Sequence, residues 1–291
     1  MSAVERQPSE GSAHGGVPAT CLDRIEWPVT LSVLAYGVRI GVRVNDPGLA
    51  NDLACHLPPG AKCVEFSDAG RVYSLIVEPD DPSGGPQSSV YVNGQLLARR
   101  STVPAVLRAF EADVQLYVAE MAPERVFVHA GVVGWRGRGI LLPGRSFTGK
   151  TALVVELVRA GAEYYSDEYA VLDSAGSVYP YARALSIREK NGAGFTKHSV
   201  DALGGHAGSG PLPVGLVVVS KFRPDREWRP NRLSPGSGLL ALLTNTVPAR
   251  RIPQIVMATL HQVVSMAPVV ASERGEASSV VEPILELAAL P

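Results

Sequence analysis

Alternating hydrophobic and polar positions predict β-strands over most of the first hundred residues. β-Branched and aromatic residues concentrate in four segments, and clusters of Gly, Pro, Asp and Asn separate them, as in strands joined by turns. Within the last segment, Asn93-Gly94 stands between VYV and QLL and predicts a two-residue β-hairpin. The predicted strand segments are 29–44, 62–66, 72–78 and 90–97.

The hydrophobic pattern then changes to a helical period. Pro104 opens a segment in which apolar residues recur every three or four positions, and Pro123 ends it. We therefore predict a small β-rich module with a closing helix over residues 23–122. Residues 1–22 mix charged residues with Ser, Gly and Pro, which predicts a flexible tail. Nothing in this part of the chain indicates a particular chemistry.

Residues 123–291 have the pattern of an α/β domain. Short apolar runs typical of buried strands alternate with amphipathic segments typical of helices. Residues 191–213 are rich in glycine and lack a long periodic run, so they predict a mobile loop. The predicted strands are 126–134, 139–142, 164–166, 169–172, 178–187 and 213–222, and the predicted helices are 149–160, 233–243, 252–265 and 276–290.

Composition narrows the class of protein. The chain has 291 residues, of which 46% are hydrophobic and 19% charged, as in a globular protein with a sizeable core. A formal net charge of −1 argues against nucleic-acid binding through a strong positive field. Three cysteines without CxxC spacing indicate neither a disulfide framework nor a zinc site. With no apolar run suited to a leader or a membrane span, we expect a cytoplasmic protein without a membrane partner, and a homo-oligomer stays open.

The strongest chemical signal is a glycine-rich loop between a predicted strand and a predicted helix. The segment matches the P-loop pattern GxxxxGK[ST] in full. Such loops turn backbone N–H groups toward phosphate oxygens, and the following helix N-terminus adds partial positive charge. The alternative is a strand–helix turn that binds no ligand. The residues of the match are Gly144, Arg145, Ser146, Phe147, Thr148, Gly149, Lys150 and Thr151.

A pair of acidic residues follows the predicted helix. Asp167 and Glu168 stand after a short strand, 17 residues beyond Lys150, and a further strand comes directly after them. This order requires substantial antiparallel pairing close to the loop, unlike the mostly parallel sheet of ordinary P-loop proteins. Carboxylates near a phosphate loop can bind magnesium or accept a proton. The alternative is a solvated turn between two strands.

Together these residues resemble the HPr kinase/phosphorylase catalytic domain. The resemblance is carried by the spacing of His129, Lys150 and Asp167, and by runs such as FVHAGVV, GILLPGRSFTGKT and LVRAGAEYYSDEYAVLD. It covers residues 125–190 closely and extends loosely to 277, whereas the first 120 residues do not match that enzyme. The resemblance implies a P-loop mixed sheet of the type shared with phosphoenolpyruvate carboxykinase.

The same resemblance implies roles for individual residues. His129 takes the place of the histidine beside the acceptor phosphate, and a satisfied core histidine is the alternative. Lys150 is placed to reach the terminal phosphates. Asp167 stands at the position of the catalytic base. Thr151 and Glu168 stand where the family binds magnesium.

Several positions depart from the family pattern. Phe147 replaces a usual glycine, Arg145 replaces an aspartate, and Ser186 stands where a further magnesium-binding glutamate is expected, with Glu189 three residues on. Three arginines downstream are candidate charge clamps for a phosphoryl group, although we favour solvated surface positions for all of them. These arginines are Arg250, Arg251 and Arg274.

The sequence therefore predicts an ATP-dependent, magnesium-requiring kinase that phosphorylates a hydroxyl. Serine of a peptide or protein is the favoured acceptor, with a peptide natural-product precursor or a small molecule left open. HPr itself is a poor candidate acceptor, because the docking region of the family has no recognisable counterpart. The alternative, motivated by Phe147 and the missing glutamate, is an ATP-binding sensor or assembly protein without transferase activity.

Overall fold

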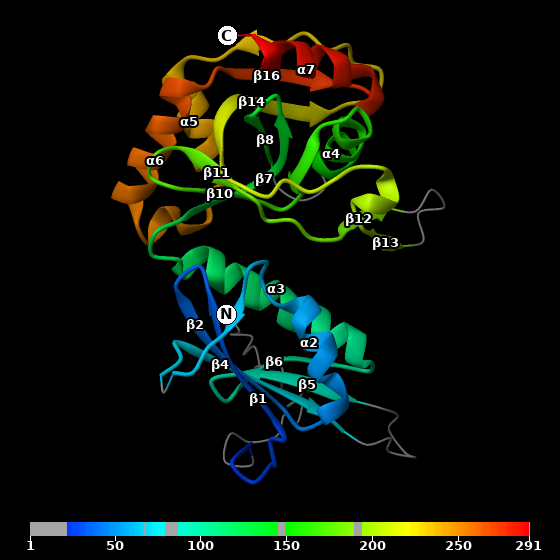
Figure 1. Cartoon of the computed structure of the whole chain (residues 1–291), viewed down its shortest axis with the longest axis vertical. Coiled ribbons are helices and arrows are strands. Elements are labelled where there is room, and N and C mark those ends of the chain that lie inside the picture. The colour runs from blue at the N-terminus through cyan, green and yellow to red at the C-terminus, as the bar shows by residue number, and fades with distance from the viewer. Residues whose placement is uncertain (1–21, 67, 79–86, 145–148, 189–193, 291) are drawn as a thin grey trace, which may run out of the picture. The chain divides into compact units, whose positions relative to one another are not determined.

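The computed structural model describes residues 22–66, 68–78, 87–144, 149–188 and 194–290 (Figure 1). The chain divides into two compact units. The described residues up to Val33, together with Arg39–His56 and Cys63–Glu111, form the first unit. Leu34–Val38, Leu57–Lys62 and the residues from Ala112 onward form the second.

The first unit is built on a six-stranded sheet with the order β3-β1-β2-β4-β5-β6. Strands β2 and β4 are parallel, whereas β4–β5 and β5–β6 are antiparallel. Phe110 of helix α3 packs edge-on against Tyr73 of β4, with ring centroids 5.1 Å apart. The elements are β1 (Val29–Ala35), β2 (Val38–Val44), η1 (Pro47–Leu49), α2 (Ala50–His56), β3 (Lys62–Cys63), β4 (Arg71–Val77), β5 (Ser88–Val92), β6 (Gln95–Arg100) and α3 (Val103–Met121).

The predictions for this unit need three corrections, the first of which is that the predicted strand 62–66 is only the two-residue β3. Segment 29–44 is two strands rather than one, because Tyr36 and Gly37 form a turn in which both residues have positive φ. Helix α2 was not predicted, because one short turn-rich segment carries too little periodicity. The hairpin at Asn93-Gly94 and the helix after Pro104 are confirmed.

The second unit has a mixed sheet with the order β11-β10-β7-β8-β14-β16-β15, and β9 pairs with β7 beyond this path. Strand β7 is antiparallel to β8, β9 and β10, whereas β8, β14 and β16 are parallel. A separate pair, β12 and β13, is antiparallel. The strands are β7 (Val126–Trp135), β8 (Arg138–Pro143), β9 (Glu163–Ser166), β10 (Tyr169–Leu172), β11 (Ser177–Tyr179), β12 (Leu185–Arg188), β13 (Phe195–His198), β14 (Leu212–Phe222), β15 (Asn231–Arg232) and β16 (Val269–Arg274).

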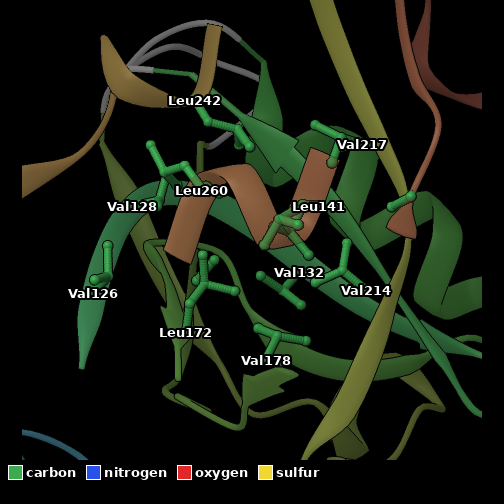
Figure 2. Packing of buried hydrophobic residues seen from close by; sticks show 14 of the residues in the cluster. Val126, Val128, Val132, Leu141, Leu172, Val178, Val214, Val217, Leu242 and Leu260 are labelled. Carbon is green, nitrogen blue, oxygen red and sulfur yellow. The ribbon is translucent and has the colours of Figure 1, made fainter. Parts of the chain in front are cut away.

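Helices cover both faces of this sheet. Leu141 of β8 joins a buried cluster with α5 and α6, whereas its neighbours Ile140 and Leu142 join a second cluster with α4 and α7. This alternation follows from the two-residue period of a strand. Figure 2 shows the first cluster, where Leu242 and Leu260 meet the valines of the strands. The helices are α4 (Lys150–Arg159), α5 (Pro235–Leu243), α6 (Pro253–Met266) and α7 (Val281–Ala289), with short 3-10 turns at Asp201–Leu203, Val247–Arg250 and Ala277–Val280.

The α/β class with a mixed sheet is confirmed, and three local predictions are wrong. Segment 178–187 is interrupted, because the chain leaves the sheet at Pro180 before β12 begins. The predicted loop 191–213 contains β13, which gains its backbone partners from β12. Strand β16 was missed, since its last residues are polar and it has only two valines, directly after Pro268.

The topology brings the carboxyl ends of three strands and the start of α4 to one edge of the sheet. Because β8, β14 and β16 are parallel, their carboxyl ends meet at the same edge, where α4 begins directly after the loop that follows β8. Open α/β sheets bind ligands outside the carboxyl ends of their strands. Among the described residues, no helix is both long and apolar enough to span a lipid bilayer.

The cluster in Figure 2 predicts which leucine supports the second unit. Leu260 is fully buried, whereas Leu240 on α5 is 60% exposed. We expect Leu260→Ala to lower the free energy of unfolding by about 2–5 kcal/mol, because it leaves a cavity in a packed core. The control Leu240→Ala is expected to change it by about 0.5 kcal/mol or less. Urea unfolding followed by circular dichroism measures both, and equal losses would contradict this assignment of the core.

Candidate active site

The two ends of the glycine-rich loop are held by backbone geometry. The N–H of Gly144 donates to the carbonyl of His129 at 3.0 Å, which extends the pairing of β7 and β8 by one step. Gly149 is the N-cap of α4 and has a φ of 83°, in the left-handed region. A Cβ added there would lie 2.7 Å from the guanidinium of Arg274, so this position requires glycine.

Arg145, Ser146, Phe147 and Thr148 lie outside the described residues. Their predicted contact with phosphate therefore stays a prediction. The described flanks agree with the expected context of the motif, since an apolar strand precedes the loop and a ten-residue helix follows it.

Lys150 is the first residue of α4, at the positive end of the helix. Burial lowers the pKa of its ammonium group, while the carboxylates of Asp167 and Glu168 raise it. A cation that is partly removed from water and placed at a helix N-terminus favours an anionic ligand. Lys150 thus lies at a helix N-terminus beside two carboxylates, and its role toward phosphate stays a prediction.

Asp167 and Glu168 occupy the tight turn between β9 and β10, as the sequence predicted. The hydroxyl of Ser166 accepts the N–H groups of Glu168, at 3.1 Å, and of Tyr169, at 3.0 Å. The carbonyl of Glu168 accepts the N–H of Ala130 on β7 at 3.1 Å. These three hydrogen bonds fix the backbone of the turn, so the side chains of Asp167 and Glu168 both extend from a rigid backbone.

The carboxylate of Asp167 joins the turn to the glycine-rich motif. The hydroxyl of Thr151 donates to its Oδ2 at 3.4 Å, and the hydroxyl of Tyr164 donates to its Oδ1 at 3.1 Å. Burial raises the pKa of Asp167, although these hydrogen bonds and Lys150 act in the opposite direction. A carboxylate with a raised pKa is a stronger proton acceptor than an ordinary aspartate.

Glu168 has a different partner. Its carboxylate accepts a hydrogen bond from Arg183 at 2.8 Å, and the same Arg183 nitrogen donates to Gln115 at 2.6 Å. The carboxyl group of Glu168 is partly removed from water, and this desolvation together with the Asp167 charge raises its pKa to about 7. Burial also lowers the pKa of Arg183 to about 10. Thr151 thus contacts Asp167, while Glu168 is held by an arginine.

Sequence reasoning missed the residues that hold Glu168. Arg183 belongs to the run YARALSIR, and its charge alone gave no signal of a buried partner. Gln115 interrupts the apolar stripe of α3 and is 2% exposed. A buried amide on an otherwise apolar helix face is a usable signal, because such groups need a hydrogen-bond partner.

His129 lies on β7 opposite Tyr169 of β10. The two rings are tilted by 34° with centroids 4.8 Å apart, and the imidazole is half-buried. Phe127, Tyr169 and Tyr181 make edge-on contacts beside it. This setting suits either a packed histidine or one that faces a ligand, so its predicted role stays a prediction.

The three candidate arginine clamps differ in their surroundings. Arg250 and Arg251 are exposed, and Arg251 donates to the carbonyl of Glu120 at 2.6 Å. For Arg274 the expectation of a solvated position is wrong, because this side chain is 1% exposed. Ser186 is exposed on β12, and Glu189 lies outside the described residues.

The residues at this site fit magnesium better than a softer metal. The Thr151 hydroxyl and the Asp167 carboxylate, 3.4 Å apart, are hard oxygen donors. Magnesium in phosphate sites is commonly held by one or two carboxylates together with substrate phosphates. Within the described ranges, no three His, Cys, Asp or Glu side chains are grouped so that they could hold a metal ion.

Comparison with known proteins gives a weak likeness. The HPr(Ser) kinase/phosphatase from Coxiella burnetii matches 55% of this chain and 92% of its own, with 15% sequence identity and a TM-score of 0.34. Such a likeness indicates at most a distant relationship of fold. No protein-family model matches the chain, and no curated protein matches it.

Glu168 makes the stability of the protein depend on pH. Its pKa rises from an ordinary value of 4.5 to about 7 on folding. The folded state therefore binds this proton more tightly than the unfolded state. The resulting stabilisation of the folded state is complete below pH about 4.5 and is lost as the pH rises through about 7. We expect Glu168→Gln, which cannot ionise, to gain stability relative to the parent between pH about 5 and about 8.

Urea unfolding of the parent and of Glu168→Gln at both pH values measures this difference. Loss of the ion pair with Arg183 changes the free energy of unfolding of the variant at each pH. The test is therefore how the difference between variant and parent changes from one pH to the other. A difference that is constant, or that moves in favour of the parent at the higher pH, would contradict the raised pKa.

Proposed function

We propose that this protein is an ATP-dependent, magnesium-requiring kinase that transfers a phosphoryl group to a hydroxyl. On this proposal the second unit is a P-loop domain of the HPr-kinase and phosphoenolpyruvate-carboxykinase type. The favoured acceptor is a serine of a peptide or protein, as the sequence resemblance implies. A peptide natural-product precursor or a small hydroxy compound falls within the same chemistry.

One observation supports the proposal most strongly: the carboxylate of Asp167 meets the end of the glycine-rich motif. The first turn of α4 and the acidic turn after β9 come together, since Thr151 donates to Asp167 at 3.4 Å and Lys150 interacts with the same carboxylate. Phosphoryl transfer needs a cation for the terminal phosphates, a hydroxyl and carboxylate for the metal, and a proton acceptor. These groups are all supplied within one small region.

The residues suggest a division of labour. Lys150 and the backbone N–H groups at the start of α4 would bind the terminal phosphates of ATP. Asp167 would accept the proton of the acceptor hydroxyl as the oxygen attacks the γ-phosphorus of ATP and the bond from that phosphorus to ADP breaks. Burial raises the pKa of Asp167 in the direction that favours this task. Tyr164, bonded to Asp167 at 3.1 Å, would orient the carboxylate.

Magnesium, when bound, would neutralise phosphate charge and help to align the reacting groups. Thr151 would hold it together with a carboxylate of the acidic pair. Sequence resemblance assigns that carboxylate to Glu168, whereas the contact of Thr151 is with Asp167. Releasing Glu168 from Arg183 would be needed before it could serve the metal.

A second function, an ATP-binding sensor without transfer, is favoured by that same ion pair. Glu168 is held by Arg183 at 2.8 Å, and Phe147 replaces the glycine of the family loop. A protein that binds nucleotide but keeps its metal-binding carboxylate engaged would bind and release ATP without chemistry. The two functions differ in one measurable property, which is phosphate transfer.

Asp167→Asn separates binding from transfer. It keeps the shape of the side chain and removes the proton acceptor, so we expect ATP affinity to change little while the single-turnover rate falls by about 10²–10⁴-fold. Glu168→Gln should instead raise the magnesium concentration needed for half-maximal rate. The measurement is transfer of labelled phosphate to a panel of serine peptides and small hydroxy amino acids.

Lys150→Ala is the control, because it should weaken ATP binding itself by removing a charge-assisted contact. Binding of ATP by the parent without transfer to any member of the panel would favour the sensor. An Asp167→Asn variant that turns over like the parent would contradict the kinase mechanism, and exchanged results for the two acidic variants would reverse their roles.

A further inference from the structure

Arg274 is buried at the edge of the sheet where the glycine-rich motif meets α4. It is the last residue of β16 and lies opposite Phe222 of the parallel strand β14. Its side chain is 1% exposed, and its guanidinium lies 5.9 Å from the centroid of the Phe222 ring. An arginine so fully removed from water normally has a specific polar task.

The guanidinium contacts the motif through the backbone. Its Nη2 donates to the carbonyl of Gly149 at 2.8 Å, and its Nη1 donates to the carbonyl of Gly275 at 3.0 Å. Its Nε is buried and has no hydrogen-bond partner among the described residues. The Gly149 carbonyl also accepts the N–H of Leu153 at 3.2 Å, so the arginine is not needed merely to satisfy it.

This arrangement brings two cations to the start of α4. Arg274 and Lys150 both carry positive charge to the positive end of the α4 dipole, where cations are disfavoured. Burial lowers the pKa of both groups. Carboxylates face these cations, Asp167 and Glu168 toward Lys150 and Glu276 toward Arg274. An anionic ligand bound at this end of α4 would interact favourably with both cations and with the helix dipole.

We infer that Arg274 is a positioning residue of the phosphate site, which holds the Gly149 peptide at the start of α4 and adds a second buried positive charge there. The inference rests on the proposed function, because it concerns the same phosphate-binding end of the helix. Its ligand class is a di- or triphosphate. The arginine would act through the Gly149 backbone, and its charge would strengthen binding before any chemistry takes place.

Binding of inorganic pyrophosphate, measured by calorimetry, tests this role. We expect Arg274→Met to weaken pyrophosphate binding by about tenfold to a hundredfold, the range for loss of a charge-assisted contact. Arg274→Lys keeps the charge and should recover most of that affinity. The control is Arg223→Met, which removes the exposed arginine that directly follows β14 and should change affinity by about threefold or less.

Thermal unfolding without ligand separates this role from a structural one. Because the buried guanidinium is incompletely bonded, we expect Arg274→Met to stay within about 4 °C of the parent. A variant that loses stability yet binds pyrophosphate like the parent would overturn the inference, as would Met and Lys variants with equal affinities. Should Arg274→Met not fold, Arg274→Gln replaces it: weaker pyrophosphate binding than in Arg274→Lys supports the role of charge, and equal affinities of these two variants overturn it.

Failure of the proposed function gives a different result. If the parent itself does not bind pyrophosphate, or if Lys150→Ala binds it equally well, the phosphate site is wrong and the inference falls with it. If Lys150→Ala loses binding while Arg274→Met retains it, the phosphate site stands and only the role of Arg274 is overturned.

Discussion

The antiparallel pairing of β7 with strands on both of its sides is the constraint on which the site depends. On one side β7 pairs with β8, which leads into the glycine-rich motif, and on the other it pairs with β9 and β10, which carry the acidic turn. Backbone bonds from Gly144 to His129 and from Ala130 to Glu168 continue the two ladders into the site. The register of one strand therefore sets the position of lysine, threonine and carboxylates alike. A shift by one residue would turn His129 to the opposite face of the sheet.

Positive and negative side chains lie on neighbouring segments at this edge of the sheet. Lys150 and Arg274 bring positive charge to the start of α4, and Asp167 and Glu168 bring negative charge to the neighbouring turn. Each group is partly desolvated, and burial shifts its pKa toward the neutral form. Clusters of this kind occur where a protein binds or transforms a charged ligand, although structural ion pairs can produce them too. The ion pair between Glu168 and Arg183 is the structural component here.

The sequence was most informative where local signals and packing agree. The hairpin at Asn93-Gly94, the strand–loop–helix around Lys150 and the acidic turn at Asp167 all combine a turn residue with a clear apolar period. Strand β16 escaped detection because its edge of polar residues looks like a surface loop, and only pairing with β14 makes it a strand. The same tertiary contact buries Arg274, whose surroundings in the sequence, SERGEA, predict exposure. Arg183 and Gln115 are 68 residues apart, and nothing local announces that they meet.

A structure of the protein with magnesium and a non-hydrolysable ATP analogue tests the central claim most directly. The account predicts terminal phosphates against Lys150 and the N-terminus of α4, with the metal held by Thr151 and a carboxylate of the acidic turn. It also predicts that the Gly149 peptide keeps its bond to Arg274. A nucleotide bound away from this edge of the sheet, with Lys150 and the acidic turn making no contact to it, would contradict the account.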